Sequence, residues 1–263
     1  VLDDLAVVSA GRTSFLDGGI RLYGLDPRTG GLRFEKTLLT RDKDGVQVLD
    51  EEGVDGWLND VLSSDGERIF MRHQVLDLKG ERLSERIPHL HAPDGFVSAD
   101  TTHRLHWTYG PQYTSSHQGA FYDQRLNRML FPTGLLLVED EEVVYGFGQN
   151  HFDKPHNKPG GKWALFSAAK ENGVPLDRTA RQYLEMGKKA EPTVRFQWWR
   201  QIPIHVRAMA KTKDILFVAG APGGGATTRE ALDGKAPGVL LAVSPADGRV
   251  RNELRLPSMP GWD

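Results

Sequence analysis

The chain has 263 residues and a nearly balanced charge, with 33 Lys and Arg against 35 Asp and Glu. This balance provides no basic field to hold nucleic acid, and no run of about 18 apolar residues is present to span a membrane. The absence of cysteine excludes disulfides, thiol nucleophiles, iron–sulfur clusters and cysteine-ligated zinc. Frequent glycine and proline, 29 and 15 residues, favour many short strands over long helices.

Short apolar segments rich in β-branched and aromatic residues follow one another along the chain and predict strands. The predicted strands, in chain order, are 5–10, 20–25, 31–38, 67–71, 73–78, 95–99, 104–109, 135–138, 143–148, 163–168, 204–210, 214–219, 238–243 and 249–256. A helical spacing of apolar residues occurs at 177–190 and predicts at most a short helix. The segment 1–10 already has the composition of a strand, without an initiator Met or a signal segment, so we expect the chain to be a fragment of a longer protein.

Two segments share one hairpin template. Residues 22–32 read LYGLDPRTGGL, and residues 240–250 read LLAVSPADGRV. In each, proline presets φ at the second turn position, and Gly30 or Gly248 accepts the positive φ at which the chain reverses. The template therefore predicts the same tight turn near both ends of the chain.

Weaker copies of this turn are centred on Gly80, Asn127 and Gly173. From Gly30 to Gly173, successive turns are 46 to 50 residues apart, and the longer last interval to Gly248 contains polar and glycine-rich inserts. A period of about 40–50 residues with about four strands per unit is typical of β-propeller blades. The sequence therefore predicts an all-β propeller of about five four-stranded antiparallel blades, forming a single domain over residues 1–263.

The segment AGRTSFLDGGIRLYGLDPRTGGLRFEKTL resembles a blade of the pyrroloquinoline-quinone-repeat propellers, in which a strand ends in a turn of type LDPxTGxxxW. Phe34 stands where that family usually has Trp. Other segments, including DVLSSDGERIFMRH and GLLLVEDEEVVYGFGQN, are similar to large bacterial quinone-binding-like propeller proteins. The resemblance, from about residue 5 to the end, implies the quinoprotein alcohol dehydrogenase-like superfamily. Because its members usually have seven or eight blades, five blades imply part of a larger propeller or a smaller closed one.

This superfamily includes quinone-dependent dehydrogenases and non-enzymatic scaffolds such as the lipoprotein of the outer-membrane protein assembly machinery. Many alcohol-oxidising members carry a disulfide of adjacent cysteines beside the quinone, which this chain lacks, and no DxDxDG-type calcium loop is present. We therefore expect a non-catalytic scaffold without a cofactor. Its partners would be a protein or carbohydrate ligand at the loop face and other domains of the same longer chain, but no nucleic acid.

The alternative function is an enzyme with its site in the central funnel of the propeller. It would be either a metal-assisted carbohydrate-active enzyme or a dehydrogenase that holds pyrroloquinoline quinone over Ca²⁺. The resemblance alone favours a periplasmic or cell-envelope location; the residues themselves do not indicate the compartment.

Histidines are the residues that most suggest chemistry. His89 and His91 are two residues apart, so a strand would place both imidazoles on one face. His103 and His106 follow, and two or three of these four with a nearby Asp would suit Zn²⁺ or Mn²⁺. The alternative interpretation is that they are ordinary histidines that form hydrogen bonds in loops.

The segment 103–122, HRLHWTYGPQYTSSHQGAFY, is the predicted ligand surface. Its candidate contact residues are Arg104, Trp107, Tyr109, Tyr113, His117 and Tyr122. Flat aromatic faces beside hydrogen-bonding groups suit sugar rings or peptides. The other interpretation is a loop between blades with ordinary packing aromatics.

Two further segments each allow two interpretations. The two Trp residues of RFQWWRQ, residues 195–201, would either stack on a ligand or pack within and between blades. The acidic run at 139–142 would be either a solvated turn that discourages edge pairing or a cation site. The glycine-rich segment 219–228 lacks the Lys of a phosphate-binding loop and is expected to be a surface loop.

Overall fold

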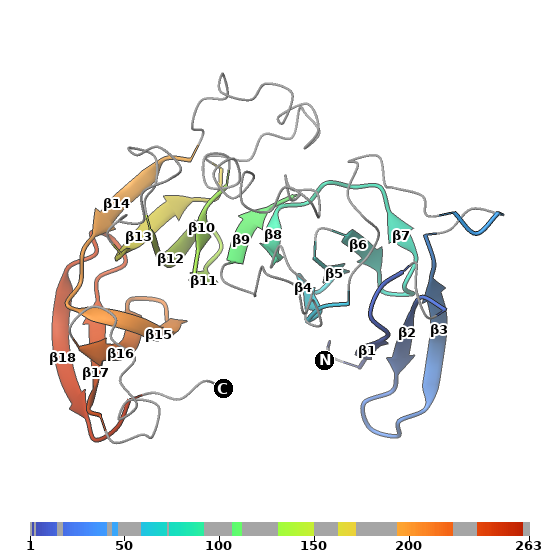
Figure 1. Ribbon diagram of the computed structural model, residues 1–263, viewed down its shortest axis with the longest axis horizontal. Coiled ribbons are helices and arrows are strands. Elements are labelled where there is room, and N and C mark those ends of the chain that lie inside the picture. The colour runs from blue at the N-terminus through green and yellow to red at the C-terminus, as the bar shows by residue number, and fades with distance from the viewer. Residues whose placement is uncertain are drawn as a thin grey trace. The chain divides into compact units, whose positions relative to one another are not determined.

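The computed structural model describes residues 2, 4–14, 18–40, 44–46, 59–72, 74–91, 107–111, 131–149, 163–171, 194–222 and 236–259. In these ranges every regular element is a strand, and the strands form five antiparallel sheets of three or four strands (Figure 1). The described ranges contain no helix that is long and apolar enough to cross a membrane. The predicted all-β class is confirmed.

The chain divides into two compact units, Val1–Asn127 with Pro175–Ala190, and Arg128–Val174 with Glu191–Asp263. The predicted single domain over 1–263 stays a prediction. The first unit contains β1 (Ala6–Ala10), β2 (Ile20–Leu25), β3 (Leu32–Leu38), β4 (Ser63–Ser64), β5 (Arg68–Met71), β6 (Gln74–Asp77), β7 (Arg82–Leu83), β8 (His89–His91) and β9 (Trp107–Gly110). Its sheets run in the orders β1-β2-β3 and β4-β5-β6-β7, and β8 pairs with β9.

The second unit contains the longest strands. They are β10 (Thr133–Gly134), β11 (Leu136–Glu139), β12 (Val143–Gln149), β13 (Trp163–Ala169), β14 (Phe196–Arg200), β15 (Ile204–Lys211), β16 (Leu216–Pro222), β17 (Gly238–Val243) and β18 (Val250–Leu256). Strands β11 to β18 form the sheets β11-β12-β13-β14 and β15-β16-β17-β18. Consecutive strands are hydrogen-bonded neighbours throughout both sheets, which is the up-and-down order of propeller blades.

Apolar side chains on facing strands bury a core within each unit. In the second unit, Phe147 and Leu165 of one sheet cluster with Val206, Leu216 and Leu241 of the next. In the first unit, Ile20 and Leu22 of β2 cluster with Ile69, Met71 and Leu76 of the following sheet. In each unit, two sheets consecutive in sequence therefore bury apolar faces against one another, which is how a repeat that cannot bury its own apolar face becomes stable.

The predicted strands match these elements closely. Strands 20–25 and 238–243 have the predicted bounds, and the other predicted strands that lie wholly in the described ranges differ by at most three residues at an end. The sequence did not predict β4, β7, β8 and β10, because two or three residues are too few to show an alternating pattern. It also did not predict β14, whose two Trp residues were interpreted either as a stacking surface for a ligand or as packing residues within and between blades. Strand 95–99, the helix at 177–190 and the turns at Asn127 and Gly173 lie outside the described residues.

The turn template at 22–32 and 240–250 folds as predicted. The Gly30 N–H donates to the Asp26 carbonyl at 2.8 Å, and the Gly248 N–H donates to the Ser244 carbonyl at 2.9 Å. Both glycines have φ of 71°. A turn one residue shorter joins β6 to β7, where the Gly80 N–H donates to the Asp77 carbonyl, three residues back, at 3.0 Å with φ of 79°.

An aromatic side chain on the outermost strand of one sheet packs onto this turn in the next sheet. The Trp198 ring of β14 lies over Gly248, where a Cβ atom would come within 2.5 Å of the ring. Its indole Nε1 also donates to the Pro245 carbonyl at 2.7 Å. Phe34 of β3 lies over Gly80 in the same way, with a Cβ atom there only 2.9 Å from the ring. The 46–50-residue period thus places an aromatic residue of each of these sheets on the following turn.

Two charged side chains repeat the same link. Arg200, two residues after Trp198, donates from Nε to the Asp247 carbonyl at 3.2 Å. Lys36, two residues after Phe34, forms an ion pair with Glu81. Residues two apart on a strand lie on one face, so the ring and the cation of each outer strand contact the same turn.

Replacing the two template glycines by alanine separates the cost of the backbone from the cost of the packing. Gly30→Ala should cost about 1–2 kcal/mol for a non-glycine residue at positive φ, because a Cβ there meets no described atom within 4 Å. Gly248→Ala should cost about 1–3 kcal/mol more, since the Trp198 ring must move. Urea denaturation followed by circular dichroism measures both. Equal losses would contradict the proposed packing role of Trp198.

Candidate functional site

The predicted metal ligands His89 and His91 lie on β8, which pairs with β9. In this register His91 lies opposite Thr108, and Leu90 lies opposite Tyr109. Residues directly opposite one another share a face of an antiparallel pair, so the histidines and Tyr109 lie on opposite faces. The ladder therefore separates the predicted metal ligands from the predicted ligand-binding aromatics of β9.

Both ring nitrogens of His89 face main-chain carbonyl oxygens. Nδ1 lies 2.7 Å from the Ile87 oxygen, and Nε2 contacts the Arg72 oxygen. Both ring nitrogens are therefore occupied by main-chain contacts. The ring also stacks on Phe70 with centroids 4.1 Å apart. In this arrangement neither nitrogen of His89 is directed at a second metal ligand among the described residues.

The other predicted site residues have different surroundings or lie elsewhere. His91 is buried, with its ring centroid 5.2 Å from that of His89. Tyr109 is buried, and Trp107 is half-buried. The remaining predicted residues lie outside the described residues: Arg104, Tyr113, His117 and Tyr122 for the ligand, and His103 and His106 for the metal. Among the described residues, no three His, Asp or Glu side chains are grouped so as to hold a metal ion.

The acidic run at 139–142 forms ion pairs with lysines of the chain itself. Asp140 accepts from the Val143 N–H at 2.9 Å, and Lys211 lies 3.2 Å from its other oxygen. Glu139 pairs with Lys170 at 2.9 Å. Burial opposes ionisation of Asp140, but the N–H groups of Val143 and Glu142 and the Lys211 ammonium keep its pKa below the usual value. Two of the four carboxylates therefore form internal ion pairs.

The two Trp residues of 195–201 pack inside the second unit. Trp198 docks on the Gly248 turn, and Trp199 stacks on Phe166 with centroids 5.5 Å apart and planes 6° apart. Phe196 approaches Phe166 edge-on at 5.0 Å. These contacts support the interpretation that the aromatic residues of this segment pack within the unit.

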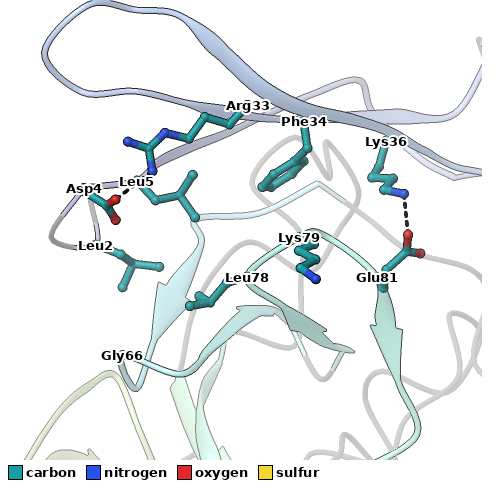
Figure 2. A pocket seen from close by; sticks show the side chains of 10 residues that line it. All are labelled: Leu2, Asp4, Leu5, Arg33, Phe34, Lys36, Gly66, Leu78, Lys79 and Glu81. Carbon is teal, nitrogen blue, oxygen red and sulfur yellow. Dashed lines mark hydrogen bonds and ion pairs between the residues drawn. The ribbon is translucent and has the colours of Figure 1, made fainter.

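A groove in the first unit is a candidate binding site. It has a volume of about 550 Å³ and lies between the outer strand β3 and the β6–β7 turn (Figure 2). Its apolar floor consists of Leu2, Leu5, Phe34 and Leu78. Its charged rim consists of Asp4, Arg33, Lys36, Lys79 and Glu81. Ligand pockets commonly have about 300–1,000 Å³ and this mixture of apolar lining with few polar groups.

Arg33 forms two ion pairs at one end of the groove. Its guanidinium donates to Asp4 Oδ2 and to Asp26 Oδ2, both at 2.8 Å. The hydrogen bond from Arg33, with those from the Arg28 and Thr29 N–H groups, lowers the pKa of Asp26 to about 2. The same guanidinium lowers the pKa of Asp4. Both carboxylates are therefore ionised throughout the physiological pH range, and the β2–β3 turn is tied to the segment that precedes β1.

The groove residues were not among the predicted site residues. Phe34 was identified only as the residue at the Trp position of the repeat turn, and this was the one signal in the sequence that pointed to the groove. Leu5, Leu78 and Lys79 come from segments joined only by tertiary packing, and nothing in their local sequence marks them as a site.

No family model matches the chain, and no curated protein matches its sequence. Among solved structures, the chain is similar to the crystal structure of BamB from Moraxella catarrhalis, with 12% sequence identity and a TM-score of 0.39. The match covers 98% of this chain and 63% of that chain, so this chain spans less than two thirds of the other's length. The expectation of no cofactor, and its alternatives of a divalent metal or pyrroloquinoline quinone with Ca²⁺, stay predictions.

The hydrogen bonds of His89 make a prediction about zinc. In long-range ¹⁵N–¹H NMR spectra, addition of equimolar Zn²⁺ should leave the ring resonances of His89 unchanged, because both ring nitrogens contact main-chain carbonyl oxygens. A zinc-dependent shift of these resonances would contradict this account and favour the metal site predicted from the sequence.

His205 of β15 makes a prediction about pH. Its ring approaches those of Phe147 and Trp163 edge-on, at 5.4 and 5.2 Å. Burial, and to a lesser extent the charge of Arg207, lowers its pKa below the usual value, so the folded state favours neutral imidazole. The stabilisation that neutral His205 gives to the folded state is therefore complete above the pKa of about 6.5 that histidine has in the unfolded chain. It is lost as the pH falls through the lower pKa of His205 in the folded state.

The free energy of unfolding should therefore fall less between pH 7.5 and 5 in His205→Phe than in the wild type, because phenylalanine keeps the ring packing without the proton. Urea denaturation at each pH measures the difference between the two proteins, which isolates His205 from other groups that titrate in this window. If the free energy of unfolding fell equally with pH in the two proteins, this would contradict the claim that burial lowers the pKa of His205.

Proposed function

We propose that the chain is a non-catalytic propeller scaffold that binds a segment of a partner protein in the groove between β3 and the β6–β7 turn. The observation that carries the proposal is the apolar floor of this groove, which is bounded by charged side chains and open at the surface. Leu78, at the tip of the turn, is 39% exposed. A partner side chain placed against it would remove apolar surface from water, which favours binding by about 25 cal/mol per Å².

The two walls of the groove are held in place by the packing of the first unit. Phe34 and the partly buried Leu2 and Leu38 pack against the core formed by β2, β5 and β6. The Lys36–Glu81 ion pair joins the same two walls. A site whose walls are already ordered loses little conformational entropy when it binds, so more of the contact energy contributes to affinity.

The chemistry of the groove supports binding rather than catalysis. Arg33 and the backbone N–H groups hold the pKa of Asp26 near 2, and Arg33 lowers the pKa of Asp4. A general acid or base needs a pKa near the working pH, so these carboxylates are poorly suited to move protons. The groove lining contains no Ser, Thr, His or Tyr side chain among the described residues.

The shape of the groove favours a peptide over a carbohydrate. The Phe34 ring is packed against Gly24 and Gly80, where a Cβ atom would lie 2.2 and 2.9 Å from it. Part of the ring is therefore covered by the chain itself, which reduces the aromatic surface on which a sugar could stack. Aliphatic side chains make up the rest of the floor and suit the apolar side chain of a peptide.

A random peptide library displayed on phage and selected against the immobilised full chain tests this proposal. Enriched peptides, synthesised with a fluorescent label, should lose at least tenfold in affinity by fluorescence anisotropy when Leu78→Asp places a charge on the floor. Leu254→Asp is the matched control, because Leu254 is 58% exposed on β18 in the second unit. Enriched peptides that bind Leu78→Asp as tightly as the wild type would contradict the proposal.

A further inference from the structure

The charged groups on the rim of the groove differ in whether they already have a partner. Arg33 is shared between Asp4 and Asp26, and Lys36 pairs with Glu81. Each of these five side chains therefore already faces an opposite charge. The remaining charged residue of the rim is Lys79.

Lys79 has a fixed backbone and an uncommitted ammonium group. Its N–H donates to Asp77 Oδ1 at 2.8 Å, inside the turn that the Gly80 N–H closes on the Asp77 carbonyl. Its side chain lies between Phe34 and Glu81 in Figure 2. Within the described part of the chain, no carboxylate pairs with its Nζ atom. The groove therefore offers one available cation beside an apolar floor.

We infer that the segment bound in this groove is extended and acidic, with an apolar side chain on the floor and an Asp or Glu side chain on Lys79. This inference rests on the proposed function, because it specifies the chemistry of the partner at the same site. Lys79 is the rim charge that no described carboxylate already compensates, so an added negative charge is complementary to it. A basic segment would meet Lys79 with like charge, which weakens association.

The geometry also indicates the spacing of the two groups. Leu78 of the floor and Lys79 of the rim are consecutive residues of one turn. We therefore expect the two ligand side chains that contact them to project from the same side of the peptide. In an extended peptide, side chains at positions i and i+2 point to the same side, about 6.5–7 Å apart along the chain. The expected motif is an aliphatic or aromatic residue with Asp or Glu two positions away.

The peptides enriched against the wild-type chain provide the probe. Those that depend on Leu78 should be enriched in Asp or Glu at two positions from an apolar residue. Lys79→Glu should weaken their binding about tenfold at low salt, and the loss should shrink as the salt concentration rises, since an exposed ion pair is screened. Lys213→Glu is the matched control, because it makes the same change of charge at an exposed residue of the second unit.

Charge reversal separates a direct contact from a general effect of charge. A peptide whose acidic residue is replaced by Lys should bind wild type weakly and recover affinity with Lys79→Glu. If peptides depend on Leu78 but show no acidic preference and no response to Lys79→Glu, the inference is wrong while the proposed function holds. If no enriched peptide depends on Leu78, the proposed function is wrong and the inference is wrong with it.

Discussion

The packing of an aromatic side chain onto a glycine turn of the next sheet is the interaction on which the rest of the structure depends. A β-sheet with one apolar face is not stable alone and must bury that face against a neighbour. Trp198 on Gly248 and Phe34 on Gly80 hold consecutive sheets in contact at their outer edges. The positive φ of these glycines forms the turn, and their missing side chain makes room for the ring, so one residue type meets two requirements.

This interaction also produces the groove. In the second unit the larger Trp198 fills the space over its turn and donates a hydrogen bond to the Pro245 carbonyl. In the first unit Phe34 is smaller and has no ring N–H to donate. The floor beside it is completed by Leu5 and Leu78 and remains open to a ligand. The groove thus lies where the sheet contact carries the smaller of the two aromatic residues, which connects the proposed binding function directly to the repeat.

The parts of the structure set by local sequence could be predicted, and those set by distant contacts could not. The Pro and Gly residues of the 22–32 and 240–250 segments fix their turns locally, and both turns formed as predicted. Which ring covers which turn depends on residues 46 to 50 positions apart. The separation of His89 from Tyr109 follows from the register of β8 against β9, which no local pattern reveals. Lys79 carries no signal at all, because its importance comes from its Nζ atom forming no ion pair with a carboxylate of the described residues.

Hydrogen–deuterium exchange on Trp198→Ala, compared with the wild type, tests the role of the aromatic contact most directly. The Gly248 N–H is bonded to the Ser244 carbonyl beneath the Trp198 ring, whereas the equivalent Gly30 N–H lies in a turn that no described ring covers. The account predicts that exchange in residues 244–249 becomes faster while exchange in residues 26–31 stays the same. Unchanged protection of residues 244–249 would contradict the claim that the aromatic ring holds the turn of the next sheet.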